Sequence, residues 1–161
     1  MKSAKDILLT VRDFYYRIRT CRLSLEALYQ ETYGLDLKIG YDKETSGAGD
    51  PHAGETVLVN KIELLDKKAE RVEKEITHYV ELINWLENLC IQTLNDQELL
   101  VIRLSFFNKK MLSRDEIARQ LRYSSAWVAK TRTSAYQKLD NRLFDLRQEH
   151  KLPEEYDDEH I

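Results

Sequence analysis

A short segment near the carboxyl end gathers side chains that could contact a polyanion. Residues 109–142 hold nine lysines and arginines against three acidic residues, a net charge of +6, although the 161-residue chain as a whole carries −3. Cations of this kind neutralise phosphates, and ammonium and hydroxyl groups can also reach the edges of bases. The candidate donors are Arg114, Arg119, Arg122, Ser124, Ser125, Lys130, Arg132, Thr133 and Lys138. Their types and crowding indicate nucleic-acid binding.

Capping patterns predict the helices that must position these donors. Asn95 is followed three residues later by Glu98, and Ser113 by Glu116, and both pairs are capping-box starts. Ser124 is expected to cap a further helix. The apolar residues that should face inward are Ile117, Ala118, Leu121, Val128, Ala135 and Leu139. The pattern predicts short capped helices, and its likeness to region 4 of bacterial sigma factors implies that they form a helix-turn-helix whose second helix enters the major groove.

The outward positions of that second helix are expected to meet DNA. They are Ser125, Ala126, Lys130 and Thr133, of which Lys130 could donate to guanine. Ala126 or Trp127 could touch a thymine methyl group. The expected phosphate contacts, which fix register without reading sequence, are Arg114, Arg119, Arg122, Arg132 and Lys138.

The segment SRDEIARQLRYSSAWVAKTRTSAYQKL resembles the helix-turn-helix of region 4 in bacterial sigma factors. Such modules have a capped first helix with "EIA" and a leucine, a short turn with serine, and a basic second helix. One position departs from the pattern. Arg122 stands in the turn where glycine is common, because the backbone there is left-handed. The resemblance implies a helix-turn-helix over residues 95–142 that binds double-stranded DNA.

Two heptad runs precede this module and predict a helical hairpin. The first runs from Ile7 to Leu28 and the second from Leu58 to Cys90, with apolar steps alternating between three and four. A period of 3.5 sustained over that length favours a left-handed coiled coil. The expected fold is therefore all-α, a long coiled-coil hairpin followed by the helix-turn-helix. A seam left open by the hairpin would serve a homodimer or a higher oligomer.

The predicted divisions follow composition. Residues 1–94 form the hairpin, with a flexible loop at 34–54 that holds all five glycines, and residues 143–161 form an acidic tail expected to be disordered. Cys21 and Cys90 fall on apolar helix faces and are expected to be reduced packing thiols. We find no apolar run long enough to cross a bilayer and no signal-peptide core, so a cytoplasmic protein without membrane contact is expected.

Over nearly its full length the chain also resembles ArpU-type and RinA-type regulators of phages and prophages of Gram-positive bacteria. The likeness lies in the opening AKDILLTVRDFYYRI, the glycine-rich interruption, the helix LVNKIELLDKKAERVEKEI and the final module. It implies a transcriptional regulator acting in a bacterial host cell. The regulator is expected to activate late or packaging genes, with contact to host RNA polymerase as a further implication.

The same sequence bears on other classes of function. The four histidines are scattered, and neither a nucleophile–base pair nor a phosphate loop nor metal-ligand spacing occurs, so neither an enzyme nor a cofactor is expected. One alternative is a small-terminase-like DNA-packaging component, which would be a ring-shaped oligomer. Another is a protein that binds RNA polymerase or a sigma factor and has little affinity for DNA.

Overall fold

The computed structural model describes residues 1–45 and 53–157, and over these residues the chain is all-helical. Two long helices, α1 (Ala4–Thr45) and α2 (Ala53–Thr93), are followed by three shorter ones, α3 (Asp96–Phe106), α4 (Arg114–Leu121) and α5 (Ser125–Gln148). A single 3-10 turn, η1 (Glu154–Tyr156), closes the described chain. This confirms the predicted fold class. No helix in the described ranges is both long and apolar enough to span a bilayer.

The chain divides into two compact units. The hairpin unit is Tyr16–Val80, and the terminal unit combines Met1–Tyr15 with Glu81–Ile161. The units therefore differ from the predicted boundary at residue 94, because the beginning of α1 and the end of α2 pack with the carboxy-terminal helices. The backbone N–H of Ala4, for example, donates to Asp140 Oδ1 on α5 at 2.6 Å.

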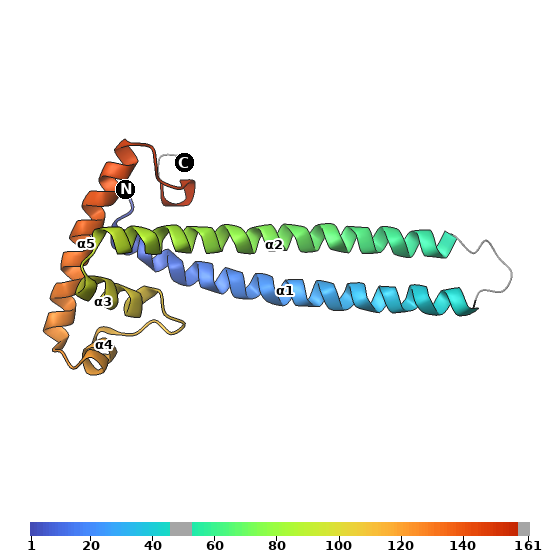
Figure 1. Ribbon diagram of the computed structural model, residues 1–161, viewed down its shortest axis with the longest axis horizontal. Coiled ribbons are helices and arrows are strands. Elements are labelled where there is room, and N and C mark those ends of the chain that lie inside the picture. The colour runs from blue at the N-terminus through green and yellow to red at the C-terminus, as the bar shows by residue number, and fades with distance from the viewer. Residues whose placement is uncertain (46–52, 158–161) are drawn as a thin grey trace. The chain divides into compact units, whose positions relative to one another are not determined.

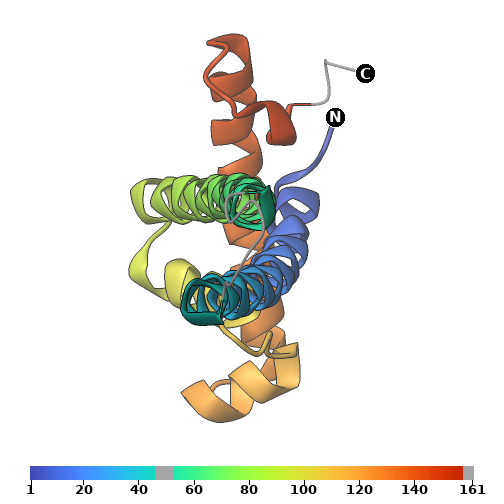
Figure 2. The ribbon, with the colours of Figure 1, turned by 90° about the vertical axis from the view of Figure 1, so that its right-hand side faces the viewer.

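Within the hairpin unit, α1 and α2 run side by side in opposite directions (Figures 1 and 2). The two heptad runs supply the contact face, with Ile18, Cys21, Leu65 and Ala69 all less than a tenth exposed. Polar pairs flank this face, since Tyr29 donates to Glu73 and Lys61 lies 4.0 Å from Glu31. The predicted hairpin is confirmed, while the supercoil expected of it stays a prediction.

The glycine-rich loop predicted at residues 34–54 is too long. Helix α1 continues through Gly34 to Thr45, and α2 already begins at Ala53. Gly34 adopts an ordinary negative φ, and Leu35 is only 6% exposed, so the apolar face of α1 extends beyond the glycine. Burial of that face outweighs the cost of about 1 kcal/mol for glycine in a helix. The rest of the expected loop, residues 46–52, lies outside the described residues.

The terminal unit is built on α5, which packs against α3 and α4. Its helix continues past residue 142 because Leu139, Leu143 and Leu146 extend one buried face. The prediction that residues 143–161 are disordered is therefore wrong for residues 143–157. Tyr156 is fully buried, donates to Leu82 O at 3.0 Å, and packs beside Trp85. Residues 158–161 lie outside the described residues.

Candidate nucleic-acid interface

The turn between α4 and α5 has the geometry that a helix-turn-helix requires. Arg122 ends α4 with φ 59° and ψ 37°, in the left-handed region predicted for this position. The N–H of Tyr123 donates to Ala118 O at 3.0 Å, which closes α4 with a Schellman motif. Ser124 then begins α5, since its side-chain oxygen accepts from the N–H of Trp127 at 3.1 Å. Only Arg122 and Tyr123 separate α4 from the cap of α5.

The predicted caps and the inner face are confirmed. Asn95 with Glu98, and Ser113 with Glu116, form complete capping boxes. A core cluster joins Val101 of α3, Ile117 and Ala118 of α4 and Val128 of α5. Leu104, Leu112, Leu121 and Trp127 are partly buried against that cluster. The small side chain of Ala118 lies within this contact between three helices, on the inner face where the sequence analysis placed it.

The outward face of α5 presents three of its four predicted residues. Ala126, Lys130 and Thr133 are exposed and lie at a spacing of four and three, which places them in one row along the helix. Thr133 already donates its hydroxyl to Ala129 O at 3.0 Å, which leaves its oxygen able to accept. Ser125 is half-buried and donates to Asp115 Oδ1 at 2.6 Å, so its hydroxyl proton is not available to a base.

Three of the predicted phosphate contacts lie on the exposed surface of α4 and its turn. Arg114, Arg119 and Arg122 are all exposed. Asp115 lies among them: Arg114 Nε is 3.6 Å from its Oδ1, and Arg119 Nε donates to its backbone oxygen at 3.4 Å. The hydrogen bond from Ser125, together with the charges of Arg114 and Arg119, holds the pKa of Asp115 below its ordinary value of 3.8. Asp115 is therefore ionised at neutral pH and offsets part of this positive charge.

The other two predicted phosphate-binding residues, Arg132 and Lys138, already have partners on α3. Arg132 donates from Nε and Nη2 to the hydroxyl oxygen of Ser105, at 3.1 and 2.9 Å. Lys138 Nζ lies 2.9 Å from Glu98 Oε2, and Ser134 donates to the other oxygen of Glu98 at 2.7 Å. Both cations thus hold α5 against α3. A phosphate would have to compete with these partners, and the phosphate contacts of Arg132 and Lys138 stay a prediction.

Two residues of this surface were missed by the sequence analysis. Tyr123 stacks on Trp127 with ring centroids 4.0 Å apart and planes 18° from parallel, and 49% of Tyr123 is exposed. Asp115 was not singled out, yet it accepts from Ser125 and lies beside Arg114 and Arg119. The position of Tyr123 directly before the predicted Ser124 cap was the available signal, because an apolar residue there often packs against the helix that follows. No such signal was available for Asp115, because its contact with Ser125 depends on the turn that brings α5 back to α4.

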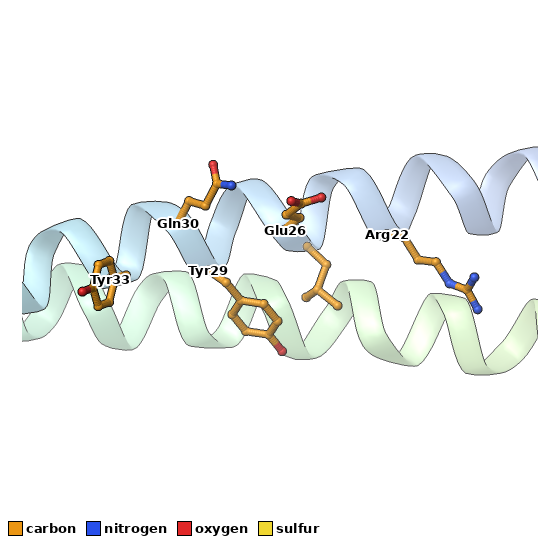
Figure 3. Close-up of a pocket in the computed structure, with 6 residues that line it drawn as sticks. Arg22, Glu26, Tyr29, Gln30 and Tyr33 are labelled. Carbon is orange, nitrogen blue, oxygen red and sulfur yellow. The ribbon is translucent and has the colours of Figure 1, made fainter.

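A separate groove lies on the hairpin unit, along one flank of α1. It is lined by Arg22, Leu25, Glu26, Tyr29, Gln30 and Tyr33. Figure 3 shows Tyr29 reaching over α2 and Gln30 pointing away from it. Tyr29 and Tyr33 are 49% and 66% exposed, and Leu25, which continues the first heptad run, is half-buried. This flank combines aromatic surface with both signs of charge.

In comparisons with known proteins, no family model, no curated protein and no solved structure matches the chain. Within the part of the chain that the structure describes, no group of three His, Cys, Asp or Glu side chains is arranged to hold a metal ion.

Proposed function

We propose that the protein is a sequence-specific DNA-binding regulator of transcription, with α5 as the helix that enters the major groove. The observation that carries this proposal is the turn before α5. A left-handed Arg122, a Schellman closure of α4 and a Ser124 cap set α5 on the packed core with its exposed row facing outward. Helix-turn-helix proteins present their recognition helix to base edges in this way.

Electrostatics supports the same proposal. The +6 charge of residues 109–142 includes four cations, Arg114, Arg119, Arg122 and Lys130, that are exposed on α4, the turn and α5. In our proposal the three arginines bind phosphates and Lys130 reaches a base edge. Arg132 and Lys138 contribute chiefly by fixing α5 on α3. This holds the exposed row of α5 at a fixed position relative to the three arginines.

The resemblance to region 4 of sigma factors and to phage regulators extends the proposal. On that basis the protein acts in the cytoplasm of a bacterial host, binds upstream of late or packaging genes of a phage or prophage, and activates them. Contact with the host RNA polymerase belongs to the same proposal.

We further propose that the hairpin unit joins two copies of the chain. The half-exposed aromatic flank of α1, with Tyr29 and Tyr33, offers apolar surface that a second hairpin would cover. A mass of two chains in light scattering would support a dimeric regulator. A ring of many chains would favour the packaging alternative, and a monomer would contradict the pairing.

Selection of bound duplexes from a random pool tests the proposed function. A regulator should enrich one motif, and a dimer should enrich it as two half-sites at fixed spacing. A pool that stays random after several rounds, with the protein folded by circular dichroism, would contradict sequence-specific binding. Capture of RNA polymerase without enrichment of any DNA would favour the polymerase-binding alternative.

A further inference from the structure

The stacked pair of Tyr123 and Trp127 lies where the proposed recognition helix begins. Tyr123 occupies the turn, and Trp127 lies in the first turn of α5. The indole is partly buried against the core cluster of α3, α4 and α5, whereas about half of Tyr123 is exposed. Their rings are nearly parallel, with centroids 4.0 Å apart. An aromatic surface is thus fixed in place at the amino end of α5.

The two serine hydroxyl groups beside this surface each already make one hydrogen bond. Ser124 accepts from the N–H of Trp127, and Ser125 donates its hydroxyl to Asp115. Ala126 adds an exposed methyl group. The first outward cation on the same face is Lys130, one helical turn further along. The first turn of α5 therefore presents mainly carbon atoms, and the ammonium group of Lys130 follows one turn later.

The edges of bases in the major groove carry one apolar group, the 5-methyl group of thymine. We propose that Tyr123 and Trp127, with Ala126 beside them, read thymine methyl groups at one end of each half-site, and that Tyr123 is a specificity-determining residue. This inference rests on the proposed function, because it requires α5 to lie in the major groove. It assigns the leading turn of α5 to thymine and leaves Lys130 to a neighbouring base.

Replacement of thymine by deoxyuridine tests the inference, because it removes the methyl group and keeps every hydrogen-bonding group of the base. The probes are a duplex recovered by selection and the same duplex with deoxyuridine at each thymine. Binding is followed by fluorescence anisotropy of a labelled strand. The wild-type protein should bind the thymine duplex more tightly, by about fourfold for each methyl group that it buries.

Three variants separate recognition from folding. Tyr123→Ala should bring the affinity ratio of the two duplexes close to one, while Tyr123→Phe keeps the ring and should keep the ratio. Lys130→Ala is the matched control from the same face: it should weaken binding to both duplexes and leave the ratio unchanged. Circular dichroism checks that each variant is folded.

The outcomes distinguish the inference from the function on which it rests. Equal affinity of the wild-type protein for both duplexes, or an unchanged ratio in folded Tyr123→Ala, would overturn the reading of thymine and leave DNA binding intact. Absence of binding to either duplex would overturn both proposals.

Discussion

The ammonium group of Lys138 on α5 lies 2.9 Å from the carboxylate of Glu98 on α3, and Glu98 is only 4% exposed. The same carboxylate accepts from Ser134 and from the N–H of Asn95, so one buried side chain both caps α3 and ties it to α5. Burial alone would raise the pKa of Glu98, but the hydrogen bonds from Lys138, Ser134 and Asn95 outweigh it and lower the pKa below 4.5. The docking of α3 on α5 therefore depends on an ionised carboxylate.

Glu98→Gln should destabilise the protein by about 1–2 kcal/mol at neutral pH, because glutamine can still cap α3 but cannot match the charge of Lys138. A carboxylate with a lowered pKa contributes stability above its ordinary pKa, and this is lost as the pH falls through the lowered value. The difference from wild type should thus be constant above about pH 5.5 and shrink below about pH 4.5. Urea unfolding of both proteins across this range measures it, and a difference independent of pH would contradict the account.

Tyr156→Ala should remove about 3–5 kcal/mol from the stability of the terminal unit, because the side chain is fully buried beside Phe14 and Trp85. Tyr156→Phe should cost about 1 kcal/mol, since it loses only the hydrogen bond to Leu82 O. Denaturant unfolding followed by the fluorescence of Trp85, with Trp127 replaced by Phe, reports on this unit. The matched control is Tyr16→Ala, which removes a tyrosine that is 71% exposed and should change stability by less than about 0.5 kcal/mol. Equal effects of Tyr156→Ala and Tyr16→Ala would refute the buried anchor.

Arg122→Gly should separate folding from binding. Glycine adopts the left-handed backbone of this turn without a steric cost. The free energy of unfolding should therefore rise by up to about 1 kcal/mol, and the midpoint of thermal unfolding should rise with it. The variant loses one proposed phosphate contact, so the slope of log affinity for DNA against log salt should fall by about one. Arg122→Lys is the control that keeps the charge. A glycine variant that is less stable, or an unchanged salt slope, would contradict this view of the turn.

The two thiols should react slowly and in a fixed order. Burial, with a smaller contribution from Glu87, raises the pKa of Cys90 to about 12, and its side chain is fully buried. Cys21 is 9% exposed, and burial and Glu75 raise its pKa as well. Alkylation by iodoacetamide at about pH 8, read by peptide mass spectrometry, should label Cys21 before Cys90, and both far more slowly than in denaturant. Fast labelling of Cys90 in the folded protein would show that this part of α2 opens readily.

Short-range sequence patterns were sufficient to predict most of the helix boundaries in the terminal unit. The caps at Asn95, Ser113 and Ser124, and the left-handed position of Arg122, follow from residue types within a few positions of each other, and the structure confirms all of them. The loop predicted at residues 34–54 is too long, because burial of Leu35, which continues the contact face, outweighs the cost of placing Gly34 in a helix.

Contacts between distant parts of the chain could not be predicted in this way. Arg132 and Lys138 look like any exposed cations until Ser105 and Glu98 are brought to them by the packing of α3. Tyr156 sits in an acidic segment whose composition suggests disorder. Its burial depends on side chains some 70 and 140 residues away in sequence, which no local pattern specifies.

The central claim is that the exposed row of α5 and the arginines of α4 bind DNA. Its most direct test is the affinity of the wild-type protein, Lys130→Ala and Lys74→Ala for a selected duplex at several salt concentrations. Lys74, an exposed lysine of the hairpin unit, is the matched control. We predict that Lys130→Ala weakens binding by about tenfold or more, that Lys74→Ala binds as the wild type does, and that Arg119→Ala with Arg122→Ala lowers the salt slope by about two. Wild-type affinity in folded Lys130→Ala together with an unchanged salt slope in the arginine pair would contradict the account.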